Sequence, residues 1–245
     1  MPSRLRESPG ARVGLSIAVA TGLYGISFGA LSVASGLSVL QTSALSLLLF
    51  SGGSQFAFIG VIAGGGNPIA AAGAAALLGI RNAVYGMQVN ALISPHGWRR
   101  FVAAQVTIDE SFATSSGQTE PVEQKRGFWF AGLGIFVLWN IFTLLGALAG
   151  SAIGDPKNWG LDGAAVAAFL ALLWPRLKSR EAGAIAIVCA LATVLAIPFV
   201  PPGIPILLAA VVAAAIGWFG YRRVEAPVAA EGLDVRTELN GGDLE

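Results

Sequence analysis

Long apolar runs alternate with short polar clusters along most of this chain. A helix needs about 20 mostly apolar residues to cross the hydrocarbon core of a membrane. The runs that meet or approach this length are 13–35, 41–65, 67–93, 127–151, 161–175, 182–200 and 204–221. The run at 161–175 is short for a full crossing. The pattern predicts an all-α fold, a polytopic membrane helix bundle.

Glycine clusters interrupt this pattern. The sequence reads SGGS at 51–54 and GGGN at 64–67. Such clusters permit broken or re-entrant helices, which line the substrate sites of many transporters. Other glycines recur four residues apart, a spacing that lets membrane helices approach closely. These include Gly25, Gly29, Gly146 and Gly150.

Composition agrees with a lipid environment. The chain is 55% hydrophobic and only 12% charged, whereas soluble domains carry roughly 25% charged residues. Six of the fourteen acidic residues fall in the last 21 positions. We expect a basic cytoplasmic N-terminus at 1–12, a transmembrane domain at 13–223 and an acidic, disordered tail at 224–245. The expected surroundings are a lipid bilayer and not a nucleic acid, which would need a dense basic patch.

The basic residues between the apolar runs bear on orientation, because positive loops mark the cytoplasmic side. Besides the N-terminus, the clusters are Arg99 and Arg100, Lys125 and Arg126, Arg176 to Arg180, and Arg222 and Arg223. If all seven runs crossed and the N-terminus lay inside, the last three basic clusters would lie outside, against the positive-inside rule. Either 67–93 is broken or re-entrant, or 101–118 forms an additional crossing. Both alternatives give six to eight crossings in the cytoplasmic membrane with both termini inside, and charge favours the first.

Arg81 is the most conspicuous polar residue within an apolar run. On a helix it shares a face with Tyr85 and Gln88, with Asn82 at the edge. A charge at membrane depth costs at least about 2.5–3.5 kcal/mol on insertion scales, so such a group usually has a partner or a function. A guanidinium can hold a substrate carboxylate through two parallel donors. The alternatives are a structural ion pair with Asp109 or Glu110, or capping of a broken helix.

Asp109 and Glu110 stand together in the segment TIDESFATSS. A carboxylate near membrane depth can bind an ammonium group, or carry a proton when desolvation raises its pKa. The alternative is a solvated amphipathic helix on the cytoplasmic surface.

Further polar positions lie in LLLFSGGSQFAF, where Ser51 and Gln55 share a helical face. They could contact a substrate, or make hydrogen bonds between helices. Asp162 has the position of a helix N-cap, and Asn140 forms a polar notch in the run 127–151. We include both as possible site residues.

Nothing in the sequence indicates an enzyme, a cofactor or a metal site. There is one cysteine, Cys189, and one histidine, His96, so a Cys/His metal site is not expected. No GxxxxGK[ST] phosphate loop occurs, so the chain is not itself an ATP-driven pump. Catalysis within the membrane would need a paired nucleophile and base, which the spacing does not offer.

Five stretches in order resemble the AzlC family, the large subunits of branched-chain amino-acid exporters. They are YGISFGALSVASGLS (24–38), LLLFSGGSQFAF (47–58), GIRNAVY (79–85), TIDESFA (107–113) and GLDGAAVAAFLALL (160–173). The resemblance implies a secondary transporter subunit that exports small aliphatic amino acids, driven by the proton gradient. It also implies a small hydrophobic AzlD-like partner subunit. Gly79, Asn82 and the sequence GLDG depart from the family pattern and put the substrate in question.

Two other functions fit the same residues. The chain could form a passive channel with no coupling to protons. It could also be a non-transporting membrane assembly subunit, in which Arg81 only pins a helix to a partner.

Overall fold

The computed structural model describes residues 8–152, 170, 173–174, 177–201, 204–205 and 207–218. The described residues are helical and contain no strand. The chain forms two compact units, Met1–Leu173 and Trp174–Glu245. Most of the predicted run at 161–175, with Asp162, lies outside the described residues, and so does the predicted acidic tail.

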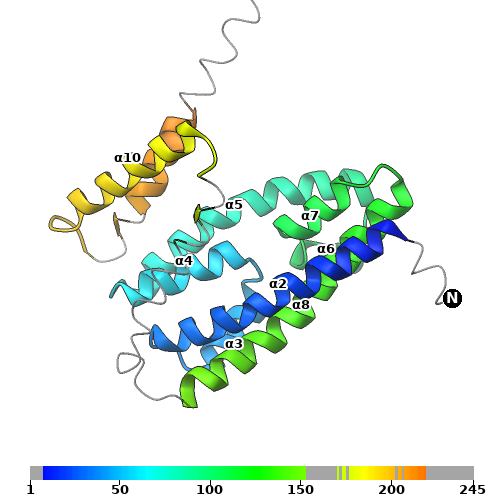
Figure 1. The fold of residues 1–245 in the computed structure, drawn as a ribbon, viewed down its shortest axis with the longest axis horizontal. Helices are drawn as coiled ribbons and strands as arrows, with labels where there is room; N and C mark the ends of the chain where they lie inside the picture. Colours follow the sequence, from blue (N-terminus) through cyan, green and yellow to red (C-terminus); the bar gives the residue numbers. More distant parts are fainter. Residues whose placement is uncertain are drawn as a thin grey trace, which may run out of the picture. The chain divides into compact units, whose positions relative to one another are not determined.

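Two long helices, α2 (Pro9–Ala34) and α8 (Pro121–Ala152), form the spine of the first unit (Figure 1). Proline occupies the first turn of α2, where a missing N–H costs nothing, and the Ser8 hydroxyl caps the helix by accepting from the Ala11 N–H. Gly10 lies against Glu123 at one end of this pair, and Gly150 lies against Ala30 at the other. The two helices are therefore parallel.

Glycine lets α2 and α8 approach closely. A Cβ at Gly25 would stand 2.7 Å from the Trp139 carbonyl oxygen, and one at Gly146 would collide with the backbone of Ile26. The spaced glycines of these two runs thus serve helix packing, as predicted. Aromatic side chains pack beside this seam: Phe28 stacks on Trp139 with ring centroids 6.0 Å apart.

The predicted run 41–65 is not one helix but two half-length helices, α3 (Val39–Leu48) and α4 (Gly52–Ala63). Thr42 near the start of α3 hydrogen-bonds Ser32 near the end of α2. At the break, Phe50 packs edge-on against Phe136, midway along α8. The helix is therefore broken at residues 49–51, and both glycines of SGGS fall in the first turn of α4.

The helix α4 then returns toward the end from which α3 came. It lies antiparallel to α5 (Pro68–Ile93), because Gly53 contacts Arg81 in the middle of α5 and the loop 64–67 joins the two helices directly. Gly65 has φ +79°, which suits glycine in this tight turn. The pair α3–α4 is thus re-entrant. We call the end of the unit that holds Ala34 and Pro68 face B.

Of the two alternatives left open by the charges, the one that charge favoured, a broken or re-entrant 67–93, is wrong. The helix α5 runs without interruption for 26 residues, about 39 Å at a rise of about 1.5 Å per residue. Asn67 caps it and Pro68 fills its first turn. Its far end packs Val89 and Ile93 against Phe128 near the start of α8. We call this end, where Pro9, Ile93 and Pro121 lie, face A.

The segment 101–118 is not a continuous crossing either. It contains α6 (Arg99–Gln105) and α7 (Asp109–Ser116), separated by three residues. Val106 at this break lies against Gly132 of α8, and Thr114 on α7 lies against Gly127, closer to face A. The pair α6–α7 therefore enters from face A and returns to it, opposite in direction to α3–α4.

Three helices among the described residues, α2, α5 and α8, are long and apolar enough to cross a membrane. Because α3–α4 is re-entrant, the run 41–65 does not count as a crossing. The number of crossings between residues 36 and 126 is therefore one fewer than the run lengths suggest, as the charges required. The basic clusters of the first unit consequently fall on one side. Arg12, Arg99, Arg100, Lys125 and Arg126 all belong to the helix ends at face A.

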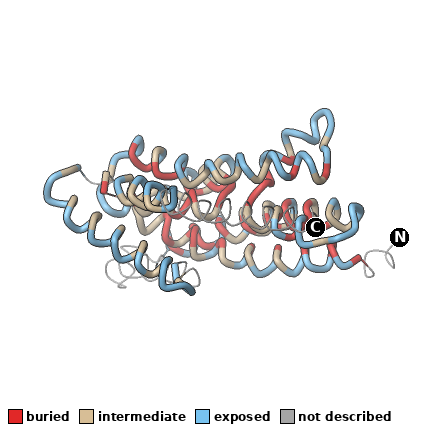
Figure 2. Tube along the Cα trace, turned by 90° about the horizontal axis from the view of Figure 1, so that it is seen from above, coloured by how far each residue is buried: buried red, intermediate tan, exposed pale blue. Residues whose placement is uncertain are grey.

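The second unit contains α10 (Arg180–Ala196) and a helix at Leu207–Trp218. Ser179 caps α10 by accepting from the Ala182 N–H. The Cys189 thiol contacts the Ala209 carbonyl oxygen at 3.5 Å, which places the two helices side by side. No residue of α10 is buried, in contrast to the buried seams of the first unit (Figure 2).

Candidate functional site

The breaks of the two re-entrant pairs lie close together inside the first unit. The Gln105 side chain at the end of α6 donates to the Leu47 carbonyl oxygen of α3 at 2.8 Å. The helices α4 and α7 both begin at these breaks, and both N-termini lie beside the middle of α5. Arg81 projects from α5 between them.

Gln55 holds the α3–α4 break together. Its side chain is fully buried, and its amide nitrogen donates to the carbonyl oxygens of Leu49 at 2.7 Å and Ser46 at 3.3 Å. Its amide oxygen accepts from the Trp139 indole N–H at 3.0 Å. These bonds satisfy backbone groups that a broken helix leaves unpaired. They match the interhelical alternative left open for Gln55.

Ser111 holds the α6–α7 break together through hydrogen bonds to its backbone. Its hydroxyl accepts from the Ile108 N–H at 3.0 Å and lies 2.7 Å from the Val106 carbonyl oxygen, to which it donates. The side chain is fully buried. Neither Ser111 nor Trp139 was a predicted site residue, although both lie inside polar notches that the sequence displays.

Arg81 forms an ion pair with Asp109, the first residue of α7. The Arg81 Nη2 and Asp109 Oδ2 atoms are 2.9 Å apart, and the two side chains are 29% and 30% exposed. The structural ion pair considered for Arg81 therefore exists. Because Asp109 faces α5, α7 is not the solvated surface helix that was the alternative for this segment.

Arg81 also lies against the first turn of α4. Its Nη2 atom is 2.8 Å from the place where a Cβ on Gly53 would stand. A Cβ at Gly53 would therefore displace the end of the Arg81 side chain from its present position. The Leu78 side chain lies on the same side of Gly53, 3.7 Å from that position.

Several buried polar atoms around this point make no hydrogen bond within the described part of the chain. They are Arg81 Nε, Asp109 Oδ1, Asn82 Oδ1 and Ser54 Oγ. Ser54 is fully buried and faces Gly79 on α5. Buried polar groups are normally paired, so this group of unpaired atoms marks a place where a polar ligand could bind.

The electrostatics of the α4 N-terminus also indicate a binding place for a polar ligand. A helix N-terminus carries a partial positive charge of roughly half a unit, which disfavours a neighbouring cation. Among the described residues no side chain caps α4, and its first turn holds no acidic residue. Both nearby acids, Asp109 and Glu110, stand in the first turn of α7. A guanidinium beside an uncapped N-terminus forms an environment that favours an anion.

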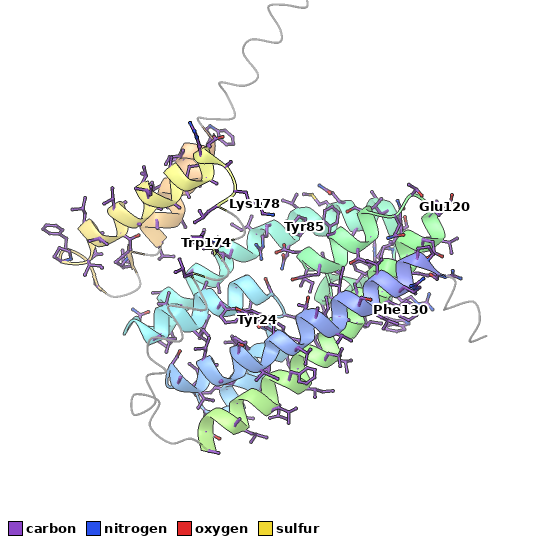
Figure 3. The ribbon with its side chains drawn as sticks, in the orientation of Figure 1. Tyr24, Tyr85, Glu120, Phe130, Trp174 and Lys178 are labelled. Carbon is purple, nitrogen blue, oxygen red and sulfur yellow. The ribbon has the colours of Figure 1, made fainter. Side chains whose placement is uncertain are left out.

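The other predicted residues lie at different distances from this point. Tyr85 projects from α5 beside α7 and stacks on Phe112, with ring centroids 4.8 Å apart (Figure 3). Gln88 is exposed and lies about one helical turn closer to face A than Tyr85 does. Ser51 is buried at the α3–α4 break.

Asn140 lies on α8, beside Trp139. Its amide nitrogen donates to the Phe136 carbonyl oxygen at 2.7 Å, and its buried Oδ1 has no partner in the described residues. The structure does not bring Asn140 into contact with Arg81. Asp162 cannot be placed, since it lies outside the described residues. No group of three metal-ligating side chains occurs among the described residues.

Comparison with known sequences shows that the chain belongs to the AzlC family. The family model described as "AzlC protein" matches residues 16–153, the part that holds both re-entrant pairs. A protein of Haemophilus influenzae, named only as an uncharacterized membrane protein, is 24% identical over 71% of this chain and 73% of its own length. One of Archaeoglobus fulgidus, with the same description, is 32% identical over 63% and 68%. No solved structure matches the chain.

Proposed function

We propose that this chain is the substrate-binding subunit of a secondary transporter that exports small aliphatic amino acids, with the branched-chain amino acids as first candidates. Membership of the AzlC family and membrane-protein relatives support a role in membrane transport. The observation that carries the proposal is Arg81, which pairs with Asp109 and lies against the uncapped α4 N-terminus.

This arrangement suits a zwitterion. The substrate carboxylate would accept from the N–H groups at the start of α4 and from Arg81, whose Nε lacks a partner in the described residues. The substrate ammonium would approach Asp109, whose Oδ1 is equally without one. Leu78 offers an apolar contact for an aliphatic side chain.

Substrate binding would then compete with the Arg81–Asp109 ion pair. A carboxylate that takes Arg81 frees Asp109 to hold the ammonium or a proton. Because Asp109 begins α7 and Arg81 belongs to α5, loosening the pair would let the α6–α7 pair move relative to α5. This supports Asp109 as the coupling residue, and Glu110 beside it as the second candidate.

The proposal includes a small hydrophobic AzlD-like partner subunit and a location in the cytoplasmic membrane with face A inside. The basic residues gathered at face A support this orientation through the positive-inside rule. Exposed apolar side chains of α5, such as Ile80 and Met87, offer a surface to lipid or to such a subunit.

The test is efflux of preloaded labelled isoleucine from cells that express the chain with its partner. We expect Arg81→Ala to reduce efflux at least about tenfold, because losing a charge-assisted hydrogen bond costs roughly 1.5–3 kcal/mol. Arg81→Lys keeps the charge without the planar fork and should retain intermediate activity. Arg100→Ala, an exposed arginine of face A, is the control and should transport normally.

The re-entrant pairs that meet at mid-depth would also suit a passive channel. Collapse of the proton gradient, with the isoleucine gradient held constant, separates the two mechanisms. Undiminished flux would establish a channel. A non-transporting assembly subunit predicts no isoleucine flux in any pairing, and Arg81→Ala should then weaken the complex with the partner subunit.

A further inference from the structure

A cavity lies at face A, away from Arg81, between the end of α5 and the start of α8. Its volume is about 510 Å³. The residues of the lining that matter here are Ile93, His96, Trp98, Arg99, Lys125 and Trp129. Residues from two distant parts of the sequence thus form one site.

The chain turns sharply after α5 to build this cavity. Ser94 ends the helix in the left-handed conformation with φ +46°, and Gly97 follows with φ +58°. The Ser94 hydroxyl donates to the Asn90 carbonyl oxygen, which anchors the turn to the last turn of the helix. This folds Trp98 and Arg99 back toward α8.

The charge of the lining has one sign. Arg99 and Lys125 are cationic, and no residue that lines the cavity is acidic. The nearest carboxylate on α8, that of Glu123, is already used: it accepts from Ser8, Gly10 and Arg126. Within the described residues neither Arg99 nor Lys125 has a salt bridge.

Two tryptophans flank these cations. Trp98 is 71% exposed, while Trp129 is half-buried and packs edge-on against Phe128. Tryptophan favours the headgroup level of a membrane, where one side of the ring meets lipid and the other meets water. The end of α5 and the start of α8 place the cavity at that level, near the end of the unit where Glu120 lies (Figure 3).

We propose that this cavity binds the headgroup of an anionic phospholipid, with the phosphate between Arg99 and Lys125. Basic pockets between transmembrane helices are suited to anionic headgroups. The two tryptophans favour a lipid over a free phosphate ion, which would not need them. The inference rests on the membrane location and the face A geometry, and does not depend on the transported substrate.

The test uses the purified full-length chain in neutral detergent, titrated with phosphatidylglycerol or phosphatidylcholine and observed by native mass spectrometry. We expect phosphatidylglycerol to bind at least about tenfold more tightly. Arg99→Gln and Lys125→Gln should each weaken it about fivefold, which corresponds to about 1 kcal/mol per basic residue. Arg100→Gln removes a neighbouring charge that does not line the cavity, and should leave binding unchanged.

Three results would overturn the proposal. Equal binding of the two lipids would show that no anionic headgroup is recognised. Equal losses in Arg99→Gln and Arg100→Gln would show that only the net charge of face A matters. Displacement of phosphatidylglycerol by millimolar inorganic phosphate would show a small-anion site. The first and third measurements use the wild-type chain, so they decide the question even where a variant fails to fold.

Discussion

Gln55 offers a direct test of how the first re-entrant pair is held. We consider Gln55→Leu, which keeps a similar volume and removes three hydrogen bonds, to Ser46, Leu49 and Trp139. Since Gln55 is fully buried, no water replaces them. The change deprives the Ser46 carbonyl oxygen and the Trp139 indole N–H of these bonds, while the Leu49 carbonyl oxygen keeps the bond from the Ser51 N–H.

The magnitude follows from these three bonds. Hydrogen bonds between membrane helices average about 0.6 kcal/mol each and reach about 1.7. Leaving a buried group unsatisfied costs about 1–3 kcal/mol in general. Because the Ser46 carbonyl oxygen and the Trp139 indole N–H are both freed in a buried place, we expect a total loss of roughly 2–4 kcal/mol in the free energy of unfolding.

The assay is unfolding of the purified chain in mixed micelles with increasing sodium dodecyl sulfate. Gln41→Leu is the matched control: Gln41 is exposed, and its side chain accepts one hydrogen bond, from the Ser38 N–H. It should cost no more than about 1 kcal/mol. If Gln55→Leu loses no more than this control, Gln55 does not hold the break.

Two further predictions concern the packing and topology of the first unit. Gly25→Leu should destabilise the chain strongly in the same assay, because its Cβ would already contact α8, whereas Gly86→Ala should be nearly neutral, since nothing lies within 4 Å of its Cβ position. In a Cys189→Ser background, Gly36→Cys and Arg100→Cys should react with a membrane-impermeant maleimide from opposite sides of the membrane. Labelling of both from one side would refute the course of the chain described above.

The apolar runs alone determined that this is a membrane helix bundle, because no soluble fold can cover so much apolar surface. The spaced glycines of α2 and α8 indicated helix contacts, and SGGS indicated a broken helix. The five motifs indicated the family. These features are local, so a single sequence displays them.

The basic clusters also showed that the number of crossings between residues 36 and 126 had to differ by one from the number expected from run lengths. It could not show which one. The alternative of a break in 67–93 was wrong, since α5 is one helix capped by Asn67. The segment that departs is α3–α4, which is held in its re-entrant form by Gln55 and Trp139, 84 residues apart.

The tertiary structure decided the composition of the candidate site. Arg81, Gly53 and Asp109 come from three helices, and their contacts depend on two breaks that meet at one depth. Sequence alone left the partner of Arg81 open, since either neighbouring acid would satisfy its charge. Which carboxylate it meets, and that it lies at an uncapped helix N-terminus, follows only from packing, because distance between charges is a property of the fold.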